Sequence, residues 1–322
     1  MKTTDYFNLT ILDVYKEFKE ELSKVDGIIR DCLKSEDKDV NKMIKYLPTL
    51  SGKRLRPLLV LISASLNDKK NTEKDIILAA VMELIHTATL IHDDVIDEAC
   101  KRRFKYTLNH EWGNRISVIF GDYLLSKSFL LLVNNFDQEI LSSISQAVSK
   151  VCQGEIREQQ RQYDKKLRKD EYLKIIEDKT ASLISACCKS GALLGKSSEI
   201  EIKAMENYGL NIGIAFQIVD DCLDLISSEK ELGKNAGNDL SKGRLTLPVI
   251  YLLNKDQEID DIFNYDKKEL MRLLKEGSYL EEALEVGKKY IKKAKKNLDN
   301  IEDSKVKIFL SVIANYVLKR RH

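Results

Sequence analysis

Two clusters of aspartate residues with the spacing Asp-Asp-x-x-Asp lie far apart in the chain, each within an apolar stretch. The clusters are Asp93, Asp94 and Asp97, and Asp220, Asp221 and Asp224. On a helix, residues three or four positions apart share a face, so the outer aspartates of each cluster project together. Carboxylates in apolar surroundings repel one another and lose hydration, which is costly unless cations compensate them. The spacing therefore predicts sites for a hard divalent cation such as Mg²⁺, which prefers oxygen ligands and bridges to phosphate.

A single acidic triplet on a helix is usually a solvated face, so the flanking residues decide between the two interpretations. Both clusters are bordered by apolar side chains, including Ile91, Val95, Ile96, Val219, Leu223 and Leu225. Little polar surface is left for a solvated face. Two such clusters in one chain favour a cage in which they face each other across a metal–diphosphate.

Basic residues accompany both clusters. They are Lys53, Arg54, Arg56, Lys101, Arg102 and Arg103 near the first, and Lys179, Lys230, Lys234, Lys242 and Arg244 near the second. Arg and Lys are the usual partners of phosphate, Arg as a bidentate donor and Lys as a point charge. Any one of them alone would be interpreted as a solvated surface residue, but the pattern fits two diphosphates, one bound through metal and one held directly.

The elements that carry these residues are predicted to be helices because apolar residues recur at helical spacing. The expected ranges are 8–34, 74–98, 115–135, 139–160, 170–195, 198–228, 279–298 and 302–321. The range 115–135 is strongly apolar and is expected to be central. Pro57 suits the first turn of another apolar helix, and one more helix is expected to start at Thr246. A loop with Gly and Lys, residues 232–244, follows the second acidic cluster, and its glycines permit close approach to a ligand.

Composition limits the fold and the function class. The chain has 322 residues, 43% of them hydrophobic and three of them proline, and no Pro/Gly/Ser-rich linker divides it. We therefore expect residues 1–322 to form one all-α domain, a helical bundle with a central cavity. The net charge of +2 gives no reason to expect nucleic-acid binding. The six cysteines have no Cys-x-x-Cys spacing, so zinc and thioredoxin-type sites find no support.

Location also follows from the sequence pattern. No secretory signal is found at the N-terminus, so the expected location is cytoplasmic, with reduced thiols. No run approaches the roughly 18 apolar residues that a membrane span needs. The run of lysines from Lys288 to Lys296 is most simply a solvated helix face, with peripheral contact to anionic lipid as the weaker alternative.

The motifs occur in an order that resembles the trans-type polyprenyl diphosphate synthase family. They are Gly52-Lys-Arg-Leu-Arg-Pro57, the first acidic cluster with Arg102-Arg103, Gly121-Asp122, Gly154-Glu155, Lys179-Thr180, Phe216-Gln217 with the second cluster, and Gly233-Lys-x-x-Gly-x-Asp-Leu-x-x-Gly243. They span roughly residues 50–250, and together they are highly specific. Within the family the chain is most similar to the catalytic component of heptaprenyl diphosphate synthases.

The resemblance implies an isoprenoid-synthase type of helical bundle and a reaction. An allylic diphosphate of the farnesyl type loses its diphosphate, the double bond of isopentenyl diphosphate attacks the allylic cation head to tail, and a proton leaves. Mg²⁺ and basic side chains stabilise the charge that develops on the leaving diphosphate. This chemistry needs no nucleophilic Ser or Cys, because the departing diphosphate serves as the base in the family.

The resemblance also assigns roles by position. Metal binding would involve Asp93, Asp97, Asp220 and Asp224, with Asp94 and Asp221 in support. The outer four aspartates and Lys179 would be catalytic. The allylic diphosphate would be held by Arg102, Lys179, Thr180, Gln217, Lys234 and Arg244. Isopentenyl diphosphate would be held by Lys53, Arg56, His86 and Arg103. His86 lies seven residues before Asp93 and so on the same helix face, whereas His92 is expected to be structural.

Three positions depart from the family pattern. Arg244 stands where the family commonly has Lys, which alters a point-like contact. Phe104 follows the arginine pair where Gly is usual, so a different turn is expected. Glu158 stands where Gln is frequent. None of the three removes a metal ligand.

Product length follows from the residues below Asp93 on the acidic face, namely Thr89, Ala88 and Ile85. Successive helical turns are about 5.4 Å apart, so these residues would line successive depths of a tunnel for the growing chain. Ala88 and Thr89 are small, and bulky aromatics there would block the tunnel. The sequence thus favours a long product, with a quinone side chain as its expected destination.

Several alternatives remain open. We expect a homodimer, or a heterodimer with a smaller non-catalytic subunit. The enzymatic rival is a homodimeric synthase of geranylgeranyl diphosphate or another shorter product. Terpene cyclases are disfavoured because they do not require the isopentenyl-binding set or two full acidic clusters. A non-catalytic helical scaffold should have lost ligands, whereas here both clusters are intact.

Overall fold

The structure is a computed structural model that describes residues 9–47, 53–66, 69–102, 104–226, 238–255, 259 and 262–319. In these residues the predicted all-α fold is confirmed: strands are confined to one hairpin of β1 (Lys101–Arg102) and β2 (Lys105–Tyr106). The longer helices are α2 (Lys19–Leu33), α4 (Leu55–Ala64), α5 (Glu73–Ile96), α6 (Leu108–Asn135), α7 (Gln138–Gln160), α9 (Ser182–Leu194), α10 (Glu199–Ile226), α14 (Lys267–Glu276), α15 (Tyr279–Asn297) and α16 (Lys305–Lys319). The shorter ones are α1 (Ile11–Glu17), α3 (Lys38–Tyr46), α8 (Lys169–Ile176), α12 (Asn238–Ser241) and α13 (Leu247–Lys255), with the π-helical turn η4 (Glu177–Ala181) between α8 and α9.

Internal contacts divide the chain into two compact units. Unit 1 comprises Met1–Ser145, Cys187–Lys203 and Glu302–Val312, and unit 2 comprises Gln146–Ala186, Ala204–Ile301 and Ile313–His322. The first acidic cluster belongs to unit 1 and the second to unit 2. That residues 1–322 form one domain, and that the two clusters face each other, stay predictions.

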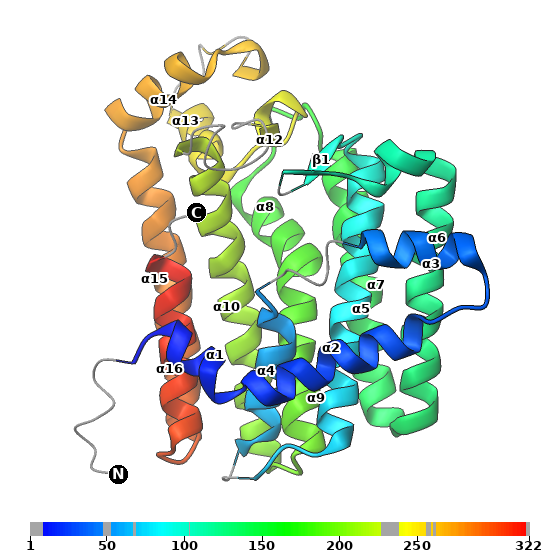
Figure 1. Cartoon of the computed structure of the whole chain (residues 1–322). Helices are drawn as coiled ribbons and strands as arrows, with labels where there is room; N and C mark the ends of the chain where they lie inside the picture. Colours follow the sequence, from blue (N-terminus) through cyan, green and yellow to red (C-terminus); the bar gives the residue numbers. More distant parts are fainter. Residues whose placement is uncertain are drawn as a thin grey trace. The chain divides into compact units, whose positions relative to one another are not determined.

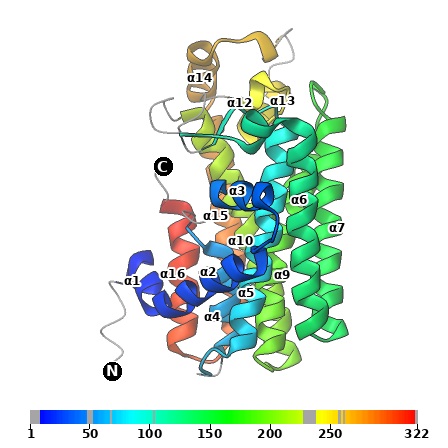
Figure 2. The ribbon, with the colours of Figure 1, turned by 45° about the vertical axis from the view of Figure 1, so that its right-hand side comes forward.

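Unit 1 is built around α5, which carries the first acidic cluster. The helix begins where the carboxylate of Asp75 accepts hydrogen bonds from the backbone N–H and the hydroxyl of Thr72, at 2.5 and 2.8 Å. From Ile76 to Ala88 nearly every side chain of α5 is buried. Helices α2 and α4 pack on it (Figure 1), and α6 runs beside it (Figure 2). A rigid, buried helix thus presents the first cluster at its C-terminal end.

The helix α6 differs from its prediction as a central element. It is interrupted at Gly113, whose φ of 80° is non-helical, and it exposes an apolar face. The residues of this face are Ile116, Ile119, Phe129, Leu130 and Val133, of which Ile119 and Val133 are 64% and 66% exposed. The expectation that no stretch reaches the length of a membrane span is also corrected, because α5 and α6 both reach it in length and hydropathy. In α5, 72% of the apolar window is buried, as in the core helix of a globular protein, against 33% in α6.

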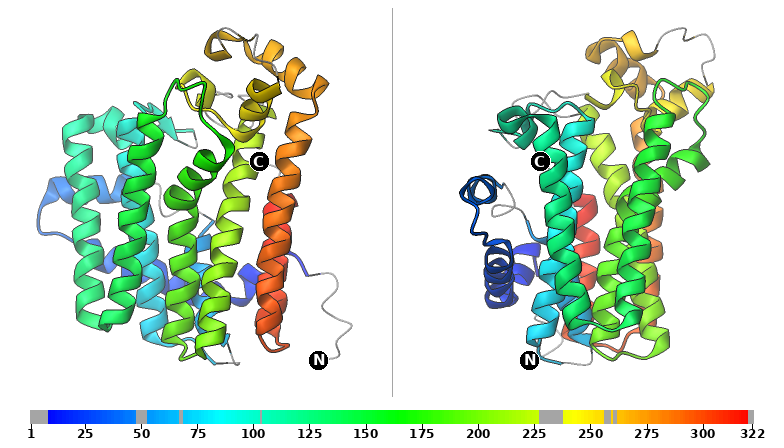
Figure 3. Two further views of the ribbon diagram at one scale, coloured as in Figure 1. Left: turned by 180° about the vertical axis from the view of Figure 1, so that it is seen from behind. Right: turned by 90° about the vertical axis from the view of Figure 1, so that its right-hand side faces the viewer.

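Unit 2 has a continuous apolar core. Buried side chains from α8, α10, α13, α14 and α15 pack together in it, among them Tyr172, Ile218, Leu247, Leu274 and Ala283. Helices α12, α13 and α14 gather at one end of α10 and α15 (Figure 3). This end of α10 carries the second acidic cluster, which the apolar core therefore holds in place.

Two of the predicted helices are each divided. The range 8–34 breaks at Phe18, whose ring packs edge-on against Phe309 with 6.1 Å between centroids. The range 170–195 contains the π-helical turn η4 between α8 and α9. Both breaks arise from tertiary packing, which apolar periodicity does not encode.

Candidate functional site

The first acidic cluster lies at the C-terminal end of α5. Asp93 and Asp97 are half-buried, and the backbone N–H of Asp97 still donates to the Asp93 carbonyl at 2.8 Å. The helical turn therefore continues through Asp97, and the predicted common face of Asp93 and Asp97 is retained. Asp94 is buried, at 7% exposure, and its carboxylate accepts a hydrogen bond from Nε of Arg102 at 2.9 Å.

The hairpin after α5 brings Arg102 back to the cluster. Lys101 pairs with Tyr106 and Arg102 with Lys105 across the two short strands. Phe104 takes a φ of 65°, in the region that favours glycine, and is 71% exposed. The backbone at this departure from the family pattern is thus one that glycine would adopt without strain. Arg103, predicted to bind isopentenyl diphosphate, lies outside the described residues.

Two basic residues at the start of α4 differ in their surroundings. Arg54 is buried and forms ion pairs with Asp26 and Glu83, both at 2.7 Å. Arg56 is half-buried; burial lowers the pKa of its guanidinium, while nearby Cys187, Glu83 and Asp93 act in the opposite direction. The predicted role of Arg56 in binding isopentenyl diphosphate stays a prediction.

Lys53 and His86 complete the residues predicted for isopentenyl diphosphate in unit 1. Lys53 is exposed, and His86 is half-buried on α5. The hydroxyl of Thr89 donates to the backbone carbonyl of His86 at 2.8 Å. Their predicted role in substrate binding stays a prediction.

Gly121 explains one of the motifs. A Cβ at this position would lie 2.3 Å from Nε2 of His92, so a larger residue here would require the His92 ring to move. In the resulting contact His92 Nε2 lies 3.2 Å from the Val118 carbonyl and 3.4 Å from the Asp122 carboxylate. His92 thus joins two helices directly beside Asp93, consistent with the structural role expected for it.

The second acidic cluster lies near the C-terminal end of α10. Asp221 accepts hydrogen bonds from the hydroxyl of Tyr172 at 2.6 Å and from the amide of Gln217 at 2.7 Å. The amide oxygen of Gln217 in turn accepts from the hydroxyl of Thr180 at 2.8 Å. Burial, reinforced by Asp239, raises the pKa of Asp221 well above its ordinary value, and the hydrogen bonds oppose this rise. Asp224 is buried and Asp220 is half-buried.

The π-helical turn η4 positions Lys179 and Thr180. Nζ of Lys179 contacts the carboxylates of Glu155 and Glu158 at 2.7 and 2.5 Å. On the preceding residue, the buried carboxylate of Asp178 pairs with Arg157 at 2.7 Å and with Lys174 at 2.9 Å. A wide turn, held by ion pairs on adjacent residues, therefore directs the lysine.

Two glycines allow neighbouring helices to reach η4. A Cβ on Gly154 of α7 would lie 2.5 Å from the backbone nitrogen of Lys179, and one on Gly213 of α10 would lie 2.5 Å from Cα of Ala181. Both neighbours are backbone atoms of η4 and cannot rotate away. The two glycines thus allow α7 and α10 to pack closely against the turn that carries Lys179.

Arg244 joins the residues around Lys179. Its Nε lies 3.1 Å from the Glu158 carboxylate, and its Nη1 lies 4.0 Å from that of Asp239. Glu158 and Arg244, both expected to depart from the family pattern, are therefore direct neighbours. Lys234, predicted for the same diphosphate, lies outside the described residues.

The donor set fits a hard divalent cation that is shared with a ligand. Among the described residues, no group of three or more His, Cys, Asp or Glu side chains is placed to hold a metal by itself. Mg²⁺, however, is usually bound by one or two carboxylates together with substrate phosphates and water. Asp93 with Asp97, and Asp220 with Asp224, supply two carboxylates each on one side of a helix.

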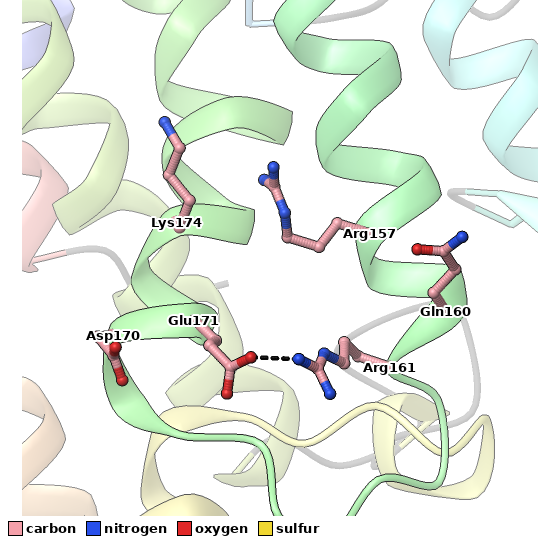
Figure 4. A pocket seen from close by; sticks show the side chains of 6 residues that line it. All are labelled: Arg157, Gln160, Arg161, Asp170, Glu171 and Lys174. Atoms are coloured by element: carbon pink, nitrogen blue, oxygen red, sulfur yellow. Dashed lines mark hydrogen bonds and ion pairs between the residues drawn. The ribbon is translucent and has the colours of Figure 1, made fainter.

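A separate hollow of about 610 Å³ lies between the end of α7 and the start of α8 (Figure 4). Its lining residues are Arg157, Gln160, Arg161, Asp170, Glu171 and Lys174. The cations in it are already compensated: Arg161 pairs with Asp164 and Glu171, while Arg157 and Lys174 pair with Asp178. The predicted site residues do not line this hollow. Its lining residues Arg157 and Lys174 support η4 through their ion pairs with Asp178.

Sequence reasoning missed one residue and one contact of this network. Tyr172 was part of an apolar helix pattern, although its position seven residues before Lys179 is a signal that the two could share a helix face. The link between Glu158 and Arg244 had no local signal, because the residues are far apart in sequence. The supporting role in metal binding that is expected of Asp94 and Asp221 stays a prediction.

Comparison with known proteins gives a consistent match. Residues 37–279 match the sequence model of the polyprenyl synthetase family. A prenyl transferase of Cyanidium caldarium is 34% identical, over 94% of this chain and 96% of that protein. Heptaprenyl diphosphate synthase component 2 of Bacillus subtilis is 32% identical, over 95% and 90%. The crystal structure of a polyprenyl synthase from Caulobacter crescentus, complexed with calcium and isoprenyl diphosphate, has a TM-score of 0.90 at 30% identity and covers 97% of this chain and 98% of its own.

Proposed function

Because the chain belongs to the polyprenyl synthetase family and is a chain-elongating trans-prenyltransferase, we propose that it adds isopentenyl diphosphate to a farnesyl-type allylic diphosphate and makes a medium- or long-chain product. One observation carries the proposal. In each acidic cluster the middle carboxylate accepts hydrogen bonds from protein side chains, Arg102 to Asp94 and Tyr172 to Asp221. The outer carboxylates share a helix face, as a pair of metal ligands requires.

We propose Mg²⁺ as the cofactor, held by Asp93 and Asp97 in unit 1 and by Asp220 and Asp224 in unit 2. When bound, the ion would neutralise charge on the diphosphate oxygens. The protein's own contribution is to fix the carboxylates: buried Asp94 and Asp221 are anchored by hydrogen bonds, so their neighbours on the same helices are held in place.

Each diphosphate has its own set of cations in this proposal. The allylic diphosphate would be held by Arg102, Lys179, Thr180, Gln217, Lys234 and Arg244, and isopentenyl diphosphate by Lys53, Arg56, His86 and Arg103. Lys179 and Arg244 are neighbours, since each lies beside the Glu158 carboxylate. Cations that contact the leaving diphosphate stabilise the charge that develops on it.

The test is the product itself. Purified protein, Mg²⁺, farnesyl diphosphate and labelled isopentenyl diphosphate should give a ladder of elongated products ending at one long chain, sized by chromatography. A ladder that stops after one addition would favour the geranylgeranyl alternative. A correctly folded protein that incorporates no label, alone or with any coexpressed subunit, would contradict the proposal.

The depth of the tunnel has its own test at Thr89, which lies one turn before Asp93 and is half-buried. Thr89→Phe should shorten the product, because the ring would occupy space that the growing chain needs. Leu90→Phe, at the next position and on a different side of α5, is the matched control and should keep the wild-type product. Equal product lengths in both variants would place the tunnel elsewhere.

We further propose that the apolar face of α6, namely Ile116, Ile119, Phe129, Leu130 and Val133, binds a second subunit. This face is covered by little of the protein itself, and apolar patches rimmed by polar residues mark association sites. The partner is a second copy of the chain or a smaller non-catalytic subunit. Light scattering of the purified chain separates these cases: a dimer that Ile119→Glu with Val133→Glu dissociates indicates the homodimer, and full activity of the chain alone argues against a required small subunit.

A further inference from the structure

Lys179 and Arg244 belong to one charged cluster in unit 2, which we call the Glu158 cluster. It consists of Lys179, Arg244, Glu155, Glu158 and Asp239. Glu158 is its centre, since one carboxylate oxygen lies 2.5 Å from Nζ of Lys179 and 3.1 Å from Nε of Arg244. Glu155 approaches Lys179 at 2.7 Å, and Asp239 approaches Arg244 at 4.0 Å.

The carboxylates of this cluster oppose the binding of an anion to its two cations. Two cations face three carboxylates, so the cluster has a formal charge of −1. The five side chains are only 13–26% exposed, and charges that are screened little by water interact strongly. A lysine ammonium has three N–H donors. On Lys179 one of them donates to Glu158, and the Glu155 carboxylate lies at ion-pair distance from the same ammonium. A diphosphate that approaches Lys179 and Arg244 therefore meets the Glu158 carboxylate between them.

Glu158 is the counter-ion that Lys179 and Arg244 share. A neutral Gln at this position would leave both cations without it.

We propose that Glu158 is a resident counter-ion of the allylic diphosphate site, which competes with diphosphate for Lys179 and Arg244. This inference rests on the proposed function, in which these two cations hold the allylic diphosphate. Glu158 lowers the affinity of the site for diphosphate and speeds the release of diphosphate after each condensation. Glu158 thus sets the affinity for diphosphate and the rate of diphosphate exchange, and it takes no part in bond formation.

The direct test is the binding of inorganic diphosphate, measured by calorimetry with and without Mg²⁺. Glu158→Gln should bind diphosphate more tightly by roughly tenfold, the range of one charge-assisted hydrogen bond. The KM for farnesyl diphosphate should fall in parallel, while the KM for isopentenyl diphosphate stays within about twofold. Glu158→Asp keeps the charge and should bind diphosphate like the wild type. That result would show that the charge of residue 158 is responsible for the weaker binding.

The matched control is Glu171→Gln. Glu171 pairs with Arg161 and is 24% exposed, against 19% for Glu158, so the change in charge and burial is the same in a neighbouring part of unit 2. This variant should bind diphosphate like the wild type.

The opposite outcome has a clear meaning. If Glu158 instead positions Lys179, then Glu158→Gln will bind diphosphate equally or more weakly, and the proposal is overturned. A wild type that binds no diphosphate and incorporates no isopentenyl diphosphate would instead show that the proposed function is wrong. Melting temperatures of both Gln variants within a few degrees of the wild type establish that folding does not cause the difference.

Discussion

Replacing Gly154 by alanine tests how strictly the π-helical turn positions Lys179. The added Cβ would lie 2.5 Å from the Lys179 nitrogen and 2.9 Å from its Cα, whereas ordinary contacts begin at 3.4 Å. One of the two backbones must therefore move by about 0.9 Å. Overpacking of this kind costs about 1–3 kcal/mol, and a displacement of about 1 Å at a reacting group reduces the rate roughly 100-fold.

The matched control is Gly287→Ala on α15 in the same unit. Its Cβ would lie 3.7 Å from the side chains of Ile218 and Val219, an ordinary contact. Both variants gain roughly 1 kcal/mol in helix propensity, so the difference between them isolates the clash. Urea midpoints and kcat for label incorporation are the measurements. If Gly154→Ala equals Gly287→Ala in both, the glycine does not govern the position of Lys179 and the reasoning fails.

Two further variants test other parts of unit 2 and of the core. Tyr172→Phe removes the donor to Asp221. It should destabilise the protein by about 1–3 kcal/mol and raise the Mg²⁺ concentration needed for half-maximal activity. The control Tyr290→Phe should leave the Mg²⁺ dependence unchanged, and the same result for Tyr172→Phe would refute this role. Burial raises the pKa of the Cys188 thiol to about 12. Its contribution to stability is thus complete below about pH 9 and is lost as pH rises towards 12, because the unfolded thiol ionises first. At pH 10.5 this loss amounts to about 2 kcal/mol, and Cys188→Ala should reduce it, whereas exposed Cys100→Ala should not; equal urea midpoints for the two variants at that pH would contradict it.

Much of this arrangement follows from local sequence. The spacing of the first acidic cluster predicted that Asp93 and Asp97 share a helix face. This holds because a helix of nearly the predicted extent forms at α5. The hydrogen bonds that Arg102 and Tyr172 donate to Asp94 and Asp221 were not predicted. Tyr172 lies on a helix that the pattern joined to the next one, and the π-helical turn between them has no periodic signal.

The remaining features depend on tertiary packing. Gly121, Gly154 and Gly213 are ordinary helix residues in the sequence, and only the fold shows that a Cβ would meet the neighbouring backbone or His92. The exposure of α6 was predicted wrongly because high apolar content was taken to mean a central position. Apolar content alone cannot distinguish a face buried within a chain from one available to another subunit.

The most direct test of the account is the incorporation of labelled isopentenyl diphosphate into elongated product by wild-type protein and by Asp93→Ala with Asp97→Ala, each with Mg²⁺ and with EDTA. We expect incorporation only by the wild type with Mg²⁺, with diphosphate released in equal amount and an unchanged circular dichroism spectrum for the double variant. Undiminished turnover by the double variant would contradict the assignment of this cluster to metal and diphosphate, and would leave the chain as a scaffold for a catalytic partner.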